Sequence, residues 1–369
     1  MHEYNICYSL DSTYTEQLAV SITSILKNAD TEDNVNFYIL DGGLTNKDKS
    51  EIKSLKNIKN FNIEYIPVNS SDFVSCPLLR EKNSDFKDYH VTLPTYYRFK
   101  LPEFITNLDK ILYLDCDVIV RCSLKKLYNT DLKDKAAAMV LDAESEKESE
   151  RLNLKNYFNA GVMLINLEFW RQCGIEKKLF DFAGENKEKI LWQDQDIINC
   201  VLSDNIIKLN NSWNFQYFLY DNINDGLLAD CRILHLAGKF KPWLLPFENS
   251  VYDEYYHYLS FTSKANKVFE YKRNAFGKFL KNNTGGNSAD ILLIASNEDI
   301  QKAYHTVDES YNYTKRQIAN ITATTDEKIS KIYDEISKNY EYTKGTVNDT
   351  KIELTINTDK KLDDVYQEI

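Results

Sequence analysis

The stretch that decides the fold is DKILYLDCDVIV, residues 109–120. Its apolar run at 111–114 is rich in β-branched and aromatic residues, which predicts a buried strand, and a second apolar run at 118–120 carries the chain onward. Asp115 and Asp117 stand between the two runs. Side chains two residues apart on an extended chain point the same way, so both carboxylates are expected to face one site at the strand end.

Two carboxylates held together in a partly buried site repel one another, and one of them would have to take up a proton. A divalent cation removes that cost. Hard oxygen ligands suit Mg²⁺ or Mn²⁺, which complete their coordination shell with substrate phosphates. The alternative is a turn at a strand edge with two solvated acids, because an Asp-x-Asp pair by itself is common. The rest of the chain has to decide between the two.

Length, charge and cysteine usage limit the class of protein. The chain has 369 residues, 43% of them hydrophobic, which suits one large domain with an appendage, or two domains. A net charge of −11 argues against nucleic-acid binding. No apolar run approaches a membrane span. The seven cysteines show no zinc or disulfide spacing, and no signal-peptide pattern precedes the first predicted strand, so a cytoplasmic protein is expected.

Strand and helix patterns alternate before the Asp-x-Asp stretch. Three strands and two helices are predicted, at residues 4–10, 15–28, 35–40, 47–55 and 61–66. This alternation is typical of an α/β protein with a mostly parallel central sheet covered by helices. In such sheets ligands bind beyond the carboxyl ends of the strands. Asp11 and Asp115 both follow predicted strands, so they are expected to approach one ligand site.

Further polar groups follow at predicted elements. The patterns predict helices at 93–101 and 192–202 and strands at 136–142 and 157–167. Each group has an ordinary explanation beside a functional one: Arg98 as a surface charge, Asp194 and Asp196 as acids that complement the dipole of a helix start, and His235 as a core histidine. The charged run at 144–151 is expected to be a surface loop or helix near the site.

Six short motifs occur in one order between residues 4 and 243. They are DSTY at 11–14, TYYR at 95–98, YLDCD at 113–117, YFNAG at 157–161, WQDQD at 192–196, and HLAG at 235–238 with KPW at 241–243. With these motifs the chain resembles the retaining glycosyltransferases of family 8, above all the bacterial lipopolysaccharide galactosyl- and glucosyltransferases. The resemblance implies a GT-A fold, which is a Rossmann-like nucleotide-sugar-binding α/β fold, with UDP-galactose or UDP-glucose as donor and Mn²⁺, or Mg²⁺ in its place, as cofactor.

The resemblance also implies which residues hold the metal and the donor. Asp115, Asp117 and His235 would bind the metal, and Mn²⁺ accepts both carboxylate and imidazole ligands. The metal would neutralise the leaving nucleotide as the sugar bond breaks. The other donor contacts would come from Ser9, Asp11, Tyr14, Arg98, Cys116, Asn159, Ala160, Gly161, Asp194, Gln195, Gly238 and Lys241.

The same resemblance suggests how the sugar is transferred. Gln195 would lie beneath the anomeric carbon with Asp194 beside it, and Asp142 would contact the acceptor or the sugar. No well-placed carboxylate nucleophile is implied, which favours an internal-return mechanism: the acceptor hydroxyl attacks from the face that the leaving group vacates. Asp196 is a less favoured candidate nucleophile.

The C-terminal third has a different character, and the resemblance fades after residue 246. We expect a catalytic domain at 1–250, a basic, aromatic, amphipathic helical segment at 251–285, and a helical tail at 286–369. Residues 252–285 suit either peripheral contact with the inner face of the cell membrane or packing on the edge of the domain. Apolar spacing of three and four predicts a coiled coil and a homo-oligomer through 300–369, the alternative being a solvated helix or a disordered tail.

The main hypothesis is a metal-dependent retaining hexosyltransferase that moves galactose or glucose from a UDP-sugar to a glycan or lipid-linked acceptor, such as lipopolysaccharide or another surface polysaccharide. Two alternatives stay open. One is a self-glycosylating protein whose tail tyrosines are acceptors. The other is a non-catalytic scaffold that binds UDP-sugar and assembles partners through its tail.

Overall fold

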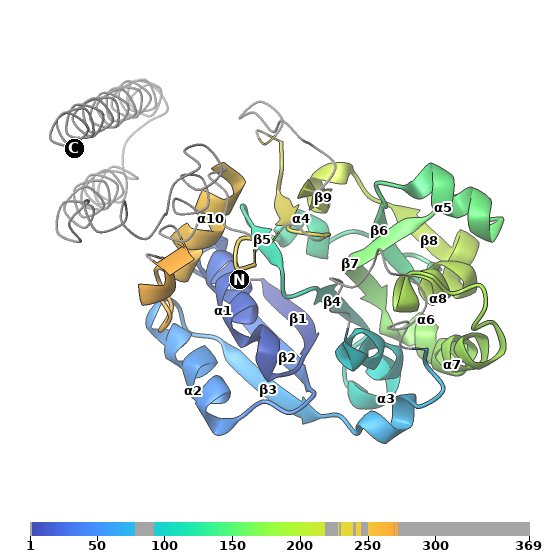
Figure 1. Cartoon of the computed structure of the whole chain (residues 1–369), viewed down its shortest axis with the longest axis horizontal. Coiled ribbons are helices and arrows are strands. Elements are labelled where there is room, and N and C mark those ends of the chain that lie inside the picture. The colour runs from blue at the N-terminus through green and yellow to red at the C-terminus, as the bar shows by residue number, and fades with distance from the viewer. Residues whose placement is uncertain are drawn as a thin grey trace, which may run out of the picture. The chain divides into compact units, whose positions relative to one another are not determined.

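The computed structural model describes residues 2–77, 92–217, 228, 230–238, 241–244, 250–268 and 270–271. The chain divides into two compact units, Met1–Phe279 and Leu280–Ile369, and every described residue belongs to the first (Figure 1). The predicted helical tail, its coiled coil and its oligomer contact lie outside the described residues, as does the basic segment beyond residue 271.

A seven-stranded sheet forms the centre of the first unit, in the order β3-β2-β1-β4-β7-β6-β8. Its strands are β1 (Glu3–Leu10), β2 (Asn34–Asp41), β3 (Asn62–Pro67), β4 (Lys110–Leu114), β6 (Ala137–Leu141), β7 (Phe158–Asn166) and β8 (Ile206–Lys208). Pairing is parallel from β3 to β4 and between β6 and β8, whereas β7 runs antiparallel to both neighbours. The expected mostly parallel sheet is confirmed.

Helices cover the sheet. The α-helices are α1 (Thr15–Asn28), α2 (Asn46–Ser54), α3 (Leu101–Phe104), α4 (Lys125–Tyr128), α5 (Ser145–Leu152), α6 (Leu167–Gln172), α7 (Ile175–Glu185), α8 (Gln193–Leu202) and α10 (Ser250–Leu259). Short 3₁₀ segments are η1 (Ser12–Tyr14), η2 (Leu55–Asn57), η3 (Ser70–Phe73), η5 (Leu93–Lys100), η6 (Ser203–Asn205) and η7 (Asn211–Trp213). The charged run at 144–151 thus forms a helix, and the helix expected at 93–101 is mostly 3₁₀.

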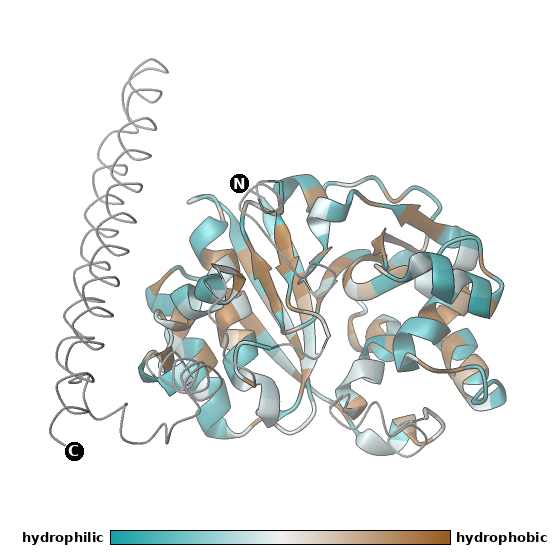
Figure 2. Cartoon of the chain, turned by 45° about the horizontal axis from the view of Figure 1, so that its top comes forward, coloured by the Kyte–Doolittle hydropathy of each residue, from teal (hydrophilic) through white to brown (hydrophobic). Residues whose placement is uncertain are grey.

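The sheet carries an apolar core on each face because side chains alternate along its strands. In β4, Leu112 and Leu114 pack into a cluster with α1 and α2, whereas Ile111 and Tyr113 pack into a second cluster with η5, α6, α7 and α8. Figure 2 shows the hydrophobic residues running along the central strands, with hydrophilic residues on the outer faces of the helices. The fold therefore holds β4 rigidly from both sides.

A smaller sheet lies beyond the end of β4, formed by β5 (Val118–Val120), β10 (Ile233–His235) and β9 (Phe215–Gln216) in the order β5-β10-β9. β10 runs antiparallel to β5, and this register sets His235 opposite Val118. The Leu236 amide donates to the Asp117 carbonyl at 3.0 Å. The small sheet thus brings a histidine from late in the chain beside the Asp-x-Asp turn.

The aromatic helix α10 belongs to the core of this unit. Its side chains Tyr252, Tyr255 and Tyr256 are buried in a third apolar cluster that also contains Leu234 and Leu236. For α10 the structure shows packing on the domain, which is the second of the two expected alternatives. Within the described ranges, no helix is both long and apolar enough to cross a membrane.

Candidate active site

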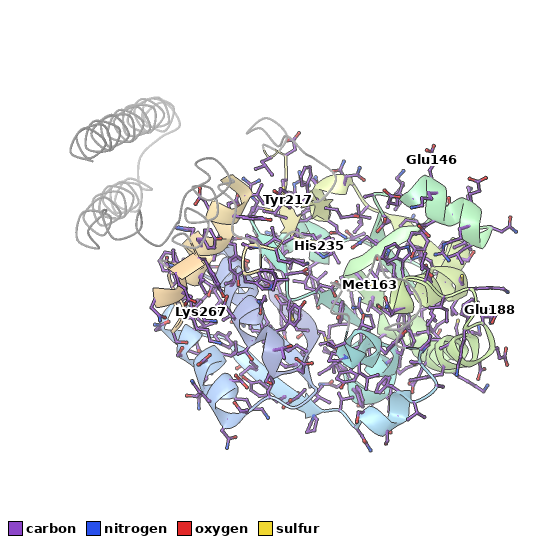
Figure 3. All side chains as sticks on the ribbon, in the orientation of Figure 1. Glu146, Met163, Glu188, Tyr217, His235 and Lys267 are labelled. Carbon is purple, nitrogen blue, oxygen red and sulfur yellow. The ribbon has the colours of Figure 1, made fainter. Side chains whose placement is uncertain are left out.

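The turn between β4 and β5 brings two acids and a histidine together. The Asp115 amide donates to the Gly161 carbonyl at 2.8 Å, which fixes the turn against β7. One ligand atom each from Asp115, Asp117 and His235 lies within 4.8 Å of the others. His235 Nε2 is 3.3 Å from Asp117 Oδ1 and 3.9 Å from Asp115 Oδ2. Figure 3 shows His235 near the middle of the unit, among the side chains of the strands.

Gly161 makes this approach possible. A Cβ atom at this position would lie 2.3 Å from His235 Cε1 and 2.9 Å from Asp115 Oδ2. Real Cβ contacts are essentially never that short, so any side chain at this point of β7 would push the histidine and the aspartate apart. Glycine within a strand is typical of such close approaches.

Two cations compensate the acids of the turn. Lys241 Nζ pairs with Asp117 Oδ2 and donates to the Leu236 carbonyl. Burial opposes ionisation of Asp117, but Lys241 and His235 outweigh it and hold the pKa of that carboxyl well below its usual range. Arg98 Nη2 donates to Asp115 Oδ1 at 3.0 Å. Both acids are therefore held ready to act as charged ligands.

Arg98 also binds the start of α8. Its Nη1 donates to the Ala160 carbonyl at 2.6 Å, and its Nε lies 3.2 Å from Asp194 Oδ2. Thr95 donates its hydroxyl to the other oxygen of Asp194. Burial raises the pKa of Asp194 to about 6, although Arg98 and Thr95 lower it in part. Arg98 is buried, so the sequence alternative of a surface charge is wrong for this residue.

A network of amides surrounds Asp142, in the region that the resemblance assigns to the sugar. Asp142 Oδ2 accepts from Asn159 Nδ2 at 3.0 Å and from Gln195 Nε2 at 3.1 Å. Gln195 Oε1 accepts from the Ala160 amide at 3.0 Å. The structure thus brings together Asp142, Asn159, Ala160 and Gln195, which the resemblance placed around the donor.

Sequence reasoning missed two members of this network, Asn214 and Gln216. Asn214 bridges Asn159 and His235. Gln216 binds the backbone on both sides of Asp142, through the Leu141 carbonyl and the Ala143 amide, each at 3.0 Å. Their spacing in the sequence could have indicated them, because polar residues two apart on an extended segment point to one side. A strand as short as β9, however, shows almost no hydrophobic periodicity by which it could be predicted.

The residues that the resemblance assigns to the nucleotide lie at the carboxyl end of β1. Asp11 accepts from the Thr13 amide at 2.9 Å and so caps η1, and Tyr14 packs edge-on against Trp243 with ring centroids 6.4 Å apart. Ser9 donates to the Pro94 carbonyl at 2.5 Å, which ties β1 to η5. Two further predicted donor residues lie close to these elements. They are Cys116, whose thiol faces the Ser9 carbonyl, and Gly238, which has a positive φ of 77° between His235 and Lys241.

The contacts of Asp196 argue against the less favoured expectation that it is the nucleophile. It is fully buried. Its Oδ1 accepts from the Tyr157 hydroxyl at 2.6 Å and from Arg151 at 2.7 Å, and its Oδ2 accepts from the amides of residues 191 and 192 at 2.7 and 3.0 Å. A carboxylate with every oxygen so occupied is held away from any substrate, and it serves to fix the start of α8.

The ligand set of the turn fits a divalent cation. Two carboxylates and an imidazole combine hard oxygen donors with a nitrogen that Mn²⁺ accepts. All three come from elements fixed by backbone bonds to β7, β5 or β10. An α/β sheet with this cluster at the carboxyl end of its strands agrees with the class that the resemblance implies, a GT-A glycosyltransferase.

Comparison with known proteins leads to the family. The family model described as glycosyl transferase family 8 matches residues 5–245, and the chain belongs to this family. A putative glycosyltransferase of Haemophilus influenzae is 34% identical over 65% of the chain and 72% of its own length. The lipopolysaccharide 1,2-glucosyltransferase of Escherichia coli is 29% identical over 65% of the chain and 73% of its own length.

A solved structure agrees with the sequence relatives. The galactosyltransferase LgtC, crystallised with donor and acceptor sugar analogs, matches 71% of this chain and 96% of its own, with a TM-score of 0.61 and 29% identity. The GT-A fold and the activity of a glycosyltransferase are therefore shown for this chain. The identity of its sugar, acceptor and metal rests on the arguments that follow.

Proposed function

We propose that the protein is a metal-dependent, retaining hexosyltransferase that uses UDP-galactose or UDP-glucose and a glycan acceptor, such as lipopolysaccharide or another surface polysaccharide. The observation that carries the proposal is the convergence of Asp115, Asp117 and His235, with Lys241 and Arg98 beside them. Two similar proteins, a lipopolysaccharide glucosyltransferase and a galactosyltransferase, support a hexose donor.

The cluster suits a sugar nucleotide because the donor carries its charge on the diphosphate. Mn²⁺ or Mg²⁺ held by Asp115, Asp117 and His235 would bridge the phosphates and stabilise the departing nucleotide. Lys241 adds a point charge on the same side, and its pairing with Asp117 keeps the ammonium at the site. Gly238 permits the turn that returns the chain from His235 to Lys241.

The environment of the acids supports retention by internal return. Among the described residues near Gln195, Asp142 is bound by two side-chain amides, Asp194 is paired with Arg98, and Asp196 is saturated. None of them is held as a free nucleophile. The acceptor hydroxyl would then attack from the face that the diphosphate leaves, while Gln195 lies on the other face and stabilises the developing positive charge through its amide carbonyl.

Hydrolysis of a panel of UDP-sugars by the purified full chain, with Mn²⁺ and with a chelator, tests the proposal. We expect turnover of UDP-galactose or UDP-glucose that needs the metal, and an α-linked product when a sugar acceptor is added. Binding of UDP with no turnover of any sugar would contradict the proposal and favour the scaffold alternative. Intact mass after the reaction separates transfer to a free acceptor from self-glycosylation.

A further inference from the structure

The orientation of the buried side-chain amides near Asp115, Asp117 and His235 follows from one backbone N–H group. The Gly161 amide, which can only donate, lies 3.0 Å from an atom of the Asn159 side chain. That atom must be the oxygen, Oδ1. The Asn159 nitrogen then faces Asp142 Oδ2, which can accept from it at 3.0 Å. Both ends of Asn159 are thereby fixed.

The same reasoning fixes Asn214 and then His235. Asn159 Oδ1 lies 2.8 Å from the Asn214 side chain, and an oxygen must face a donor, so the Asn214 atom there is its nitrogen. The Asn214 oxygen is left facing His235 Nδ1 at 2.9 Å. Since an amide oxygen can only accept, Nδ1 carries the proton. His235 Nε2, which points at Asp115 and Asp117, is then the ring nitrogen that is left to bind a cation.

We propose that Asn214 is the positioning residue of the metal centre: it holds His235 in the tautomer whose Nε2 can bind the cation. Through Asn159 it also joins that histidine to Asp142 and Gln195 on the sugar side. The inference rests on the metal role given to His235 under the proposed function. Asn214, to which the inference gives this positioning role, lies outside all six sequence motifs.

Burial makes the hydrogen-bond partners in this arrangement hard to replace. Asn214 is 1% exposed, His235 4% and Asn159 7%, so water does not replace a lost partner easily, and an unpaired amide or imidazole N–H there is costly. Partners that orient a metal-binding histidine in this way typically change metal affinity about 10- to 100-fold when removed. We expect an effect of that size here.

The first measurement needs no metal. Selective ¹⁵N labelling of the five histidines reports the tautomer of each ring in the metal-free full chain, and His235→Ala identifies the signal of His235. We expect Nδ1 of His235 to carry a proton in the wild type and to lose it in Asn214→Leu, a variant of nearly the same shape in which only Nε2 keeps a hydrogen-bond acceptor. Asn214→Ala gives a second test where the leucine variant does not fold.

The second measurement is the Mn²⁺ dissociation constant, by titration calorimetry or electron paramagnetic resonance. We expect Asn214→Leu to weaken binding about 10- to 100-fold and Asn214→Asp to restore part of it, because a carboxylate oxygen also accepts from Nδ1 but cannot donate to Asn159. Asn5→Leu is the matched control: Asn5 is a buried asparagine with two side-chain partners, Tyr128 and Asn36. That variant should lose stability and keep the wild-type dissociation constant.

The outcomes separate the inference from the proposed function. An unchanged tautomer and an unchanged Mn²⁺ dissociation constant in Asn214→Leu would overturn the role of Asn214, whatever the enzyme does. A failure of the wild type to bind Mn²⁺ or Mg²⁺ would overturn the metal role of the cluster instead. An equal loss in the leucine and aspartate variants would also count against tautomer control, since only the first removes the acceptor.

Discussion

Two Asp-x-Asp pairs in this chain have opposite fates. Asp115 and Asp117 follow a strand, and both carboxylates reach His235. Asp194 and Asp196 begin the helix α8, and they diverge: Asp194 faces Arg98, whereas Asp196 faces Tyr157 and Arg151. Residues two apart share a face on an extended chain but lie on different sides of a helix. The same Asp-x-Asp sequence therefore brings both acids to one site when it follows a strand. When it begins a helix, one acid faces the site and the other has a structural role.

The largest effect is expected at the strand pair. Asp117→Asn keeps the shape of the side chain but removes the charge that balances Lys241 and binds the cation. We expect metal-dependent hydrolysis of the donor to fall by at least about 100-fold, more than for an outer partner of a metal ligand, with the fold intact by circular dichroism. Unchanged hydrolysis would show that the turn is not the metal site.

The close packing at Gly161 offers a second way to break the strand pair. Gly161→Ala should separate His235 from Asp115 and weaken Mn²⁺ binding about 10- to 100-fold, as measured by calorimetry. Gly184→Ala is the control, because a Cβ there meets nothing within 4 Å and alanine favours a helix by up to about 1 kcal/mol over glycine. Equal Mn²⁺ affinity in both variants would contradict the close-approach argument.

Of the two acids that begin α8, Asp196 is expected to contribute to the stability of the protein and not to its catalysis. Asp196→Asn removes one of the two buried carboxylates that pair with Arg151, the other being Glu148, and gives two backbone amides a poorer acceptor. We expect a loss of about 1–3 kcal/mol in the free energy of unfolding, measured by urea denaturation, with the turnover number nearly unchanged below the melting temperature. A large fall in turnover without a loss of stability would return Asp196 to the list of catalytic candidates.

The sequence predicted the fold and the centre of the site because both depend on local patterns. Apolar runs and alternation in the sequence predicted the strands. The spacing of Asp115 and Asp117 predicted that they face one site, and the family resemblance added His235. Asn214 was not predictable in this way: its role comes from the pairing of β9 with β10, a contact between short segments without periodicity. The fate of Asp196 was also hidden, because only the packing of α5 and α8 shows which face of the helix each acid takes.

The smallest expected effect is a difference between the two Asp-x-Asp pairs in how their contribution to stability depends on pH. Burial raises the pKa of Asp194 to about 6 from its ordinary value of 3.8, so between these two pH values the folded protein binds more protons than the unfolded chain. Stability that comes from this carboxyl is then lost as the pH rises, by about 1 kcal/mol between pH 5 and pH 7. Asp117 has the opposite shift, and its contribution to stability is lost only at acid pH.

Asp194→Asn isolates this contribution because it cannot titrate and keeps the size of the side chain. The free energy of unfolding of the wild type minus that of the variant, measured in denaturant at pH 5 and at pH 7, should decrease by about 1 kcal/mol over that interval. A difference that stays constant or increases with pH would mean that Arg98 and Thr95 stabilise the charged form of Asp194 enough to outweigh its burial. The two pairs would then differ only in the directions that their side chains take.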